Sequence, residues 1–215
     1  MSFRKAALFA ALFCATSTCA AVSAAETQGN AGHFLVRLRA IGVVPDERST
    51  VSAIGGAIKA SSTVVPELDL SYFFTDNLAV ELIAAVTKHS LDDVGSTAGT
   101  APLGSTWLLP PTVTVQYHFL SDTKFDPYVG AGLNYTTMFS VRKPSTGPVT
   151  AVHYGDSFGP ALQAGVDYRL DDRWSLNLDL KKVWLKTDVA INNGAIAAKV
   201  HLDPWIIGTG VGYRF

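Results

Sequence analysis

The sequence has little cysteine, and both cysteines lie in a segment that we expect the mature protein to lose. Cys14 and Cys19 fall within the first 25 residues, where Arg4 and Lys5 precede an apolar run and a stretch of small residues. This order is typical of a secretory signal peptide, with cleavage expected near residue 24 or 25. The mature domain, residues 26–215, then has no cysteine and no disulfide framework.

Charge is also scarce, and no run of like charge occurs. Charged residues make up 16% of the chain, and removing Arg4 and Lys5 with the signal leaves 15 of the 17 basic residues against 18 acidic ones. This balance gives no support to a nucleic-acid partner. The mature chain also lacks the ~20 continuous apolar residues of a spanning helix, and it shows no convincing helical periodicity.

The mature sequence does have apolar residues that alternate with polar ones at a period of two. In residues 112–119, for example, Val113, Val115 and Tyr117 alternate with Thr114 and Gln116. Such alternation predicts a strand with one apolar face. The pattern recurs and predicts eight strands, within residues 33–44, 66–74, 78–87, 112–119, 128–135, 158–168, 174–181 and 205–215.

The connections between these strands alternate in length. Tight polar turns are expected at 75–77, 121–124 and 171–173, and long segments at about 45–63, 88–107, 142–156 and 191–199. Short turns at one rim and long loops at the other are typical of an up-and-down barrel of the outer-membrane type. We therefore predict an all-β, eight-stranded antiparallel transmembrane barrel with short periplasmic turns and long extracellular loops.

A soluble lipocalin-like barrel would show the same alternation, but with its apolar face inward. Two features favour the membrane barrel. Glycines occupy the polar face, where they relieve crowding in a narrow interior: Gly130, Gly132, Gly165, Gly208, Gly210 and Gly212. Aromatic residues of the apolar face cluster beside the short turns and the termini, as an interfacial belt requires: Phe34, Tyr72, Phe74, Phe119, Tyr168, Trp174, Tyr213 and Phe215.

Four stretches, "LPPTVTVQYHF", "PYVGAGLNYT", "LDLKKVWLKTDV" and "DPWIIGTGVGYRF", resemble the OmpW family of bacterial outer-membrane proteins, which includes AlkL-type alkane-uptake proteins. The resemblance covers essentially the whole mature chain, although loops such as "KPSTGPVTAVHYGDS" depart from it. It implies a mainly hydrophobic channel, closed toward the periplasm, that releases small apolar molecules sideways into the membrane. It also implies the alternative roles of bacteriocin receptor and stress-responsive surface protein.

The up-and-down topology places a set of charged residues in the lower to middle interior. This predicted charged floor consists of Arg37, Arg39, Glu67, Asp69, Glu81, Asp167, Asp179 and Lys181. Opposite charges confined in a narrow barrel are expected to pair, because unpaired buried charge is costly. A purely structural salt-bridge plug is the simplest interpretation.

Inward residues nearer the long loops are apolar and predict a hydrophobic channel lining. They are Ile41, Val43, Val65, Ile83, Val183, Leu185 and Ile206, to which Trp107, Leu108 and Leu109 of the second long segment are added. A small hydrophobic solute would enter such a funnel, whereas an aqueous porin would need a continuous wet path. The alternative is that these residues only pack beneath the loops.

Prolines mark the positions where we expect the barrel wall to open most easily. Each proline ring removes one backbone N–H that would otherwise donate a hydrogen bond to the neighbouring strand. Pro111 and Pro160 are the candidates for a lateral opening, and Pro204 lies at another strand end. The alternative is that these prolines mark only the upper ends of strands. Tyr213 and the closing Phe215 resemble the signal read by the outer-membrane assembly machinery.

Enzymatic and metal sites are not expected. His89 and Ser90 are adjacent, but neighbours in a strand point to opposite faces and no acid orients the imidazole. The histidines lack metal-ligand spacing: His33, His89, His118, His153 and His201. We predict no cofactor, and outer-membrane lipid and a small hydrophobic solute as partners. The predicted function is a passive hydrophobic channel; the alternative is a structural or surface-receptor barrel without transport.

Overall fold

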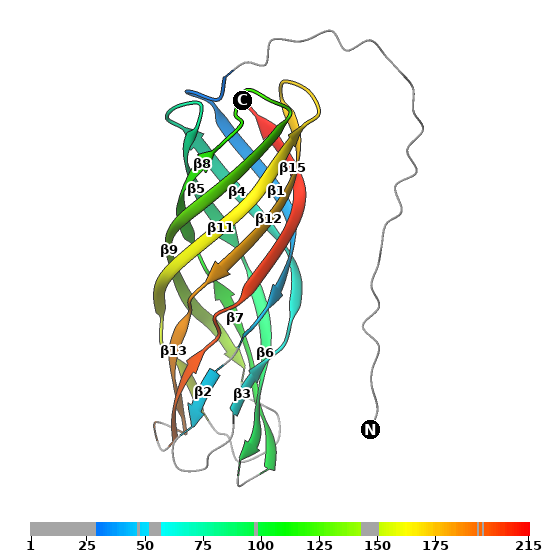
Figure 1. Ribbon diagram of the computed structural model, residues 1–215. Coiled ribbons are helices and arrows are strands. Elements are labelled where there is room, and N and C mark those ends of the chain that lie inside the picture. Colours follow the sequence, from blue (N-terminus) through cyan, green and yellow to red (C-terminus); the bar gives the residue numbers. More distant parts are fainter. Residues whose placement is uncertain are drawn as a thin grey trace, which may run out of the picture.

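Antiparallel β-strands build the whole fold, and each strand of the barrel pairs with the next one along the wall (Figure 1). The computed structural model describes residues 29–46, 48–51, 57–96, 99–142, 151–192, 194 and 196–215. The expected signal peptide, residues 1–25, lies outside these described residues. Within them, no helix is long and apolar enough to cross a membrane.

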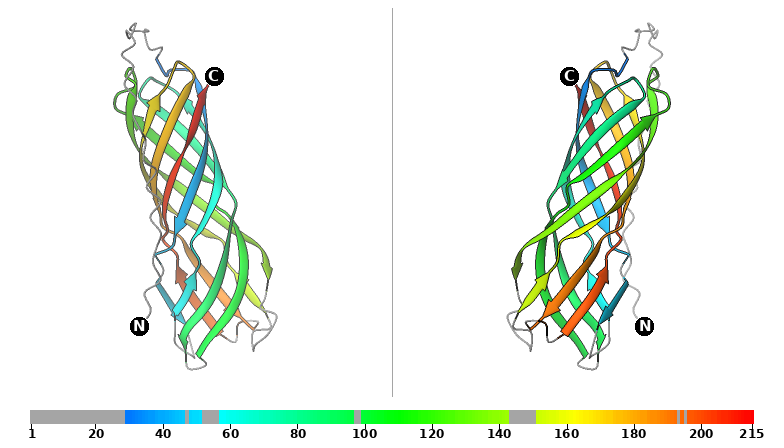
Figure 2. Two further views of the ribbon diagram at one scale, coloured as in Figure 1. Left: turned by 90° about the vertical axis from the view of Figure 1, so that its right-hand side faces the viewer. Right: turned by 90° about the vertical axis from the view of Figure 1, so that its left-hand side faces the viewer.

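Eight strands form the barrel, as the alternation predicted. They are β1 (Phe34–Val44), β4 (Thr63–Phe73), β5 (Leu78–Ala85), β8 (Thr112–His118), β9 (Phe125–Arg142), β11 (Ser157–Arg169), β12 (Trp174–Val183) and β15 (Trp205–Arg214). The ring is closed, because β1 pairs with both β4 and β15. On the opposite side β9 pairs with both β8 and β11. The closed cylinder is seen from two further sides in Figure 2.

The two faces of each strand confirm that this barrel is of the membrane type. In β8, Thr114 and Gln116 are buried inside the barrel, while Val113 and Val115 are half exposed on its outside. An apolar outer face and a polar interior are the arrangement that lipid requires. Aromatic rings meet on the outer face near the short turns, with centroid distances of 4.8 Å for Phe34–Tyr72 and 4.9 Å for Trp174–Tyr213.

Tight polar turns close the barrel at the end where the chain terminates (Figure 1). Between β4 and β5, the Phe74 amide donates to the Leu78 carbonyl at 2.9 Å. Between β11 and β12, the Asp171 carboxylate accepts hydrogen bonds from the amides of Arg173 at 2.8 Å and Trp174 at 2.7 Å. These side-chain caps fix the short connections that the sequence predicted.

Further strands extend the wall at the other end, where the sequence predicted long loops (Figure 2). This extension consists of β2 (Arg48–Val51), β3 (Ala57–Ala60), β6 (Thr87–Ser96), β7 (Gly99–Leu109), β10 (Val152–Tyr154), β13 (Lys186–Ile191) and β14 (Ile196–His201). β7, β6 and β3 continue outward from β9, and β10, β13, β14 and β2 form a second sheet. Much of each long segment is therefore paired strand, which deepens the barrel interior.

Candidate functional site

A network of ion pairs fills the middle of the barrel, and we call it the charged plug. It contains the eight residues of the predicted floor, each at most 4% exposed: Arg37, Arg39, Glu67, Asp69, Glu81, Asp167, Asp179 and Lys181. They come from β1, β4, β5, β11 and β12, and strand register brings them to one height. Arg37 lies opposite Asp69 across the β1–β4 pair, and Arg39 lies opposite Glu67.

Arg39 is the most connected member of the plug. Its Nη2 lies 2.9 Å from Glu81 Oε1, and its Nε lies 3.2 Å from Asp69 Oδ2. Its Nη1 lies 3.2 Å from Asp179 Oδ1 and 3.3 Å from Glu67 Oε1. One guanidinium thus contacts four carboxylates, which balances charges that would be costly to bury alone.

Arg37 and Lys181 tie the remaining strands into the plug. Arg37 contacts Glu81 at 3.0 Å and Asp167 at 2.5 Å. Lys181 Nζ pairs with Glu67 and lies 3.1 Å from Asp179 Oδ1. The predicted charges therefore do pair with one another, and the plug crosses the barrel from β1 to β11 and β12.

Uncharged polar residues complete the plug, and the sequence analysis gave them no role. Gln163 Nε2 donates to Glu81 Oε2 at 2.9 Å and to Asp179 Oδ2 at 2.8 Å. The Tyr128 hydroxyl donates to Asp179 Oδ2 at 2.7 Å. Gln116 Nε2 donates to Glu81 Oε2 at 2.8 Å. These residues occupy inward-facing positions in the alternation, as the charged residues do. That position was the signal in the sequence that they belong to the interior.

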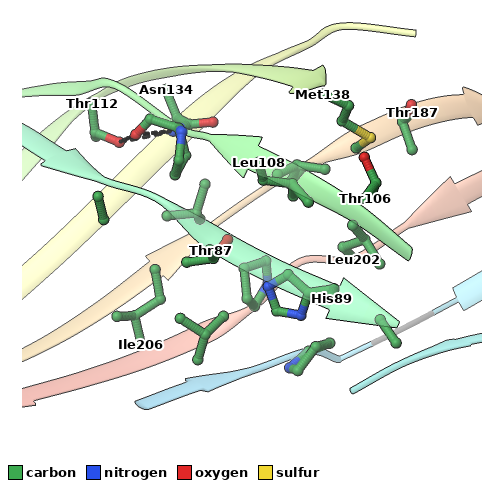
Figure 3. A pocket seen from close by; sticks show the side chains of 18 of the residues that line it. Thr87, His89, Thr106, Leu108, Thr112, Asn134, Met138, Thr187, Leu202 and Ile206 are labelled. Atoms are coloured by element: carbon green, nitrogen blue, oxygen red, sulfur yellow. Dashed lines mark hydrogen bonds between the residues drawn. The ribbon is translucent and has the colours of Figure 1, made fainter. Parts of the chain in front are cut away.

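An apolar cavity lies between the charged plug and the extension (Figure 3). Its volume is about 70 Å³, and Glu67 and Lys181 of the plug form part of its lining. Most of its wall is aliphatic: Ile41, Val43, Ile83, Ala85, Leu108, Val183, Leu185, Val189, Val200, Leu202 and Ile206. The space is smaller than ordinary ligand pockets of ~300–1,000 Å³, which favours a small apolar molecule.

Seven residues of the predicted lining lie on the wall of this cavity: Ile41, Val43, Ile83, Leu108, Val183, Leu185 and Ile206. Another, Val65, packs beside it against the buried cluster of Ile41, Val43 and Ala85. The structure thus brings together side chains from several barrel strands that sequence reasoning had placed at one height.

Trp107 and Leu109 were predicted to line the channel, and this prediction is wrong. Residues 99–109 form strand β7 rather than a loop, so their side chains alternate between the two faces. Leu108 is buried and lines the cavity, whereas its neighbours are on the outer face. The Lys88 ammonium lies 5.8 Å from the centre of the Trp107 ring, and Lys88 is exposed.

The sequence analysis missed the part of the cavity that the extension builds. Val189 of β13 and Val200 of β14 are buried, and they form one cluster with Leu108, Leu185 and Leu202. Residues 191–199 were expected to be a loop, and the β13–β14 pairing across them was not predicted. The short alternation in "TDVAI" and "AAKVH" was the available signal.

His89 and Ser90 occupy opposite faces of β6, as their adjacency in a strand predicted. His89 is buried and lines the cavity, and Ser90 is exposed. The His89 Nδ1 lies 2.6 Å from the Ser61 carbonyl oxygen. The two side chains therefore do not form a nucleophile–base pair.

Pro160 and Pro111 each lie where regular pairing with one neighbouring strand ends. Regular β11–β12 pairing ends at Ala161 and Val183, and beyond it the Trp184 amide donates to the Pro160 carbonyl at 3.0 Å. We call this contact the Pro160 seam. At Pro111, the carbonyl accepts from the Tyr135 amide at 3.0 Å. Pro204 likewise has its carbonyl paired, with the Val183 amide at 3.2 Å.

Gly159 shows how closely the two backbones approach at the Pro160 seam. A Cβ added there would collide with the Trp184 carbonyl oxygen. The N–H and C=O groups of one residue in an antiparallel strand point to the same neighbouring strand. Because the Pro160 carbonyl accepts from Trp184, a backbone N–H at position 160 would also face Trp184, and the proline ring removes it. The seam is therefore tightly packed but lacks one backbone hydrogen bond.

The final residues complete the aromatic belt beside the short turns. The rings of Tyr213 and Phe215 meet edge to face at 4.8 Å, and both lie on the outer side of β15 or directly after it. The Phe215 amide donates to the Phe34 carbonyl at 2.9 Å, which joins the end of the last strand to the first. Their role as an assembly signal stays a prediction.

Comparison with known proteins agrees with this architecture. A model of the OmpW family matches residues 30–215. Outer membrane protein W of Vibrio cholerae serotype O1 is 35% identical over 94% of this chain and 98% of its own length. Outer membrane protein AlkL of Ectopseudomonas oleovorans is 27% identical over 80% of this chain and 77% of its own length.

A solved structure shows the same fold. The crystal structure of the outer membrane protein OprG from Pseudomonas aeruginosa has a TM-score of 0.81 and 29% identity, and the match covers 89% of this chain and 99% of that one. The relatives are outer-membrane barrel proteins, which places this protein in the outer membrane. The chain belongs to the OmpW family.

Proposed function

We propose that this protein is a passive outer-membrane channel for small hydrophobic molecules. The observation that carries the proposal is the apolar cavity, which is bounded by the charged plug on its periplasmic side. An apolar molecule gains free energy when it leaves water for such a wall. An ion gains nothing there, and it would have to displace paired charges to go further. The arrangement favours an apolar solute.

A relative supports an aromatic or aliphatic solute. A protein of Pseudomonas aeruginosa that is 29% identical over 75% of this chain is named a dibenzothiophene metabolism operon protein, PahQ. Dibenzothiophene is a fused, flat and apolar ring system. We infer that this chain handles molecules of the same general character.

The Pro160 seam provides the proposed exit. A solute in the cavity faces the plug toward the periplasm, so the remaining way out is sideways through the wall. Val183 and Leu185 line the cavity from the inside. Trp184 between them lines a groove on the outer surface with Leu162 and Leu180. The wall at this point is one strand thick, and on its β11 side it lacks one backbone hydrogen bond. We propose that it opens toward the membrane.

Uptake of naphthalene by cells that carry the protein tests the proposal. Ile83→Asp adds a carboxylate to the cavity wall, and we expect it to slow uptake several-fold, because a buried charge repels an apolar solute. Ser90→Asp adds the same charge on the outer face of the extension and serves as the matched control. Heat-modified mobility of the folded barrel verifies assembly of both variants. Unchanged uptake in folded Ile83→Asp would favour the alternative, a structural or surface-receptor barrel.

A further inference from the structure

His89 is the polar group of the cavity whose hydrogen-bonding capacity is incompletely used. It is 4% exposed, and its side chain lies among Leu108, Leu202 and other wall residues (Figure 3). Its Nδ1 lies 2.6 Å from the Ser61 carbonyl oxygen. A carbonyl oxygen only accepts hydrogen bonds, so Nδ1 must carry the hydrogen.

The other ring nitrogen is therefore an acceptor. When Nδ1 carries the hydrogen of a neutral imidazole, Nε2 has a free lone pair. No group in the part of the chain that the structure describes donates a hydrogen bond to it. His89 lies on β6 of the extension, between the exposed Lys88 and Ser90. Burial lowers the pKa of this imidazole, which favours the neutral ring.

Three of the four threonines in the cavity lining donate their hydroxyl groups to backbone carbonyls. Thr187 donates to the Gly155 carbonyl at 2.7 Å, and Thr112 donates to the Pro110 carbonyl at 3.1 Å. Thr106 donates to the Phe139 carbonyl at 3.3 Å. These three threonines therefore do not donate to His89, and Thr87, two residues before it on the same face of β6, is the fourth threonine of the lining.

A second group in the lining is also unsatisfied. The Tyr154 hydroxyl is buried and has no hydrogen-bond partner among the described residues. A buried polar group without a partner costs free energy, and a ligand that supplies the partner recovers it. The cavity wall thus carries an acceptor on His89 and a separate unsatisfied hydroxyl on Tyr154.

We propose that the cavity selects apolar molecules that carry one neutral hydroxyl group, and that this hydroxyl donates to His89 Nε2. Phenols and alcohols are the ligand class. A carboxylate would bring a charge into an apolar wall without a donor to receive it. A pure hydrocarbon would leave Nε2 unpaired. The inference rests on the proposed function, since it assigns the substrate class of the same cavity.

Three ligands that share one ring system test the inference: 2-naphthol, 2-methoxynaphthalene and naphthalene. The first has a hydroxyl donor, the second has the same oxygen without its hydrogen, and the third has no oxygen. Binding to the purified full-length barrel is measured by calorimetry in detergent micelles, against a blank of micelles alone. We expect 2-naphthol to bind about fivefold more tightly than 2-methoxynaphthalene, the effect of one hydrogen bond.

Three variants locate the preference. His89→Phe keeps a ring but removes the acceptor, so we expect the fivefold preference to fall to about one while 2-methoxynaphthalene binds as before. His89→Gln retains an acceptor oxygen and should restore part of the preference. His153→Phe, at an exposed position of β10 in the extension, is the matched control and should keep the full preference.

The outcomes separate the inference from the proposed function. If wild-type protein binds all three ligands equally, or if His89→Phe keeps the preference for 2-naphthol, the hydroxyl inference is overturned and the hydrophobic channel stands. If wild-type protein binds none of the three, the proposed function fails and the inference fails with it. A preference that disappears in His89→Phe and persists in His153→Phe supports the inference.

Discussion

At the scale of single residues, Gly165 of β11 leaves the space that Tyr128 occupies inside the charged plug. A Cβ added at Gly165 would collide with the Tyr128 hydroxyl oxygen and would lie 2.7 Å from the Leu178 carbonyl oxygen. Tyr128 is 1% exposed, and its hydroxyl donates to Asp179. The missing side chain therefore allows an aromatic ring to cross a narrow interior and to hydrogen-bond to the plug.

Gly165→Ala is expected to destabilise the barrel by about 1–3 kcal/mol, the usual cost of overpacking a filled interior. The added methyl group must displace Tyr128 or spread β11 from β12. Gly42→Ala is the matched control, because a Cβ there meets nothing nearer than the Ile207 carbonyl oxygen at 3.9 Å. The free energy of unfolding in urea, followed by circular dichroism in lipid vesicles, compares the two. Equal stability of both variants would contradict this account of Gly165.

At the scale of elements, the sequence predicts the eight barrel strands better than the extension. A barrel strand has lipid on one side and a polar interior on the other, so its two faces differ in polarity and the alternation is easy to read. Beyond the lipid, that contrast weakens. β13 has buried Val189 and Ile191 on one face, while Ala190 lies on the other face. This short run was assigned to no strand in the sequence, and the 191–199 segment that follows it was interpreted as a loop.

The same argument explains which site residues could be predicted. Each plug residue occupies an inward-facing position of a barrel strand. The alternation of residues along the strand and the up-and-down topology are therefore enough to predict where it lies in the interior. Trp107 and Leu109 were misplaced, because parity was not applied to a segment interpreted as a loop. The partners of each charge depend on strand register and on side-chain conformation. A single sequence fixes neither, and the contacts of Gln163 and Tyr128 were therefore not foreseen.

Pro160→Ala tests the Pro160 seam as an element of the wall. Alanine restores an N–H on the side of β11 that faces Trp184, so we expect about 1 kcal/mol of added stability from one more hydrogen bond. If the solute leaves at this seam, naphthalene uptake should slow several-fold.

Pro111→Ala is the matched control for the Pro160 seam, because Pro111 has the same kind of backbone pairing at another place in the wall. Stability is measured by urea unfolding and uptake in the same cells as for Ile83→Asp. A barrel that gains stability in Pro160→Ala but takes up naphthalene at the wild-type rate would show that the exit lies elsewhere. Slower uptake in Pro111→Ala alone would place the opening at the other candidate.

At the scale of the whole molecule, three layers follow one another along the barrel axis. The aromatic belt and tight turns lie at one end, the charged plug crosses the middle, and the apolar cavity opens toward the extension. The plug holds strands from opposite sides of the wall together, and it also forms the base of the cavity through Glu67 and Lys181. The same network thus stabilises the barrel and closes the cavity toward the periplasm.

A crystal structure of the protein grown with 2-bromonaphthalene tests the central claim most directly, because the anomalous signal of bromine locates the ligand. The claim is that the cavity between the plug and the extension takes up small apolar molecules. We predict a bromine peak inside the barrel, among Ile83, Leu108 and Leu185. Bromine peaks confined to the lipid-facing surface, with the cavity wall unchanged, would contradict the claim.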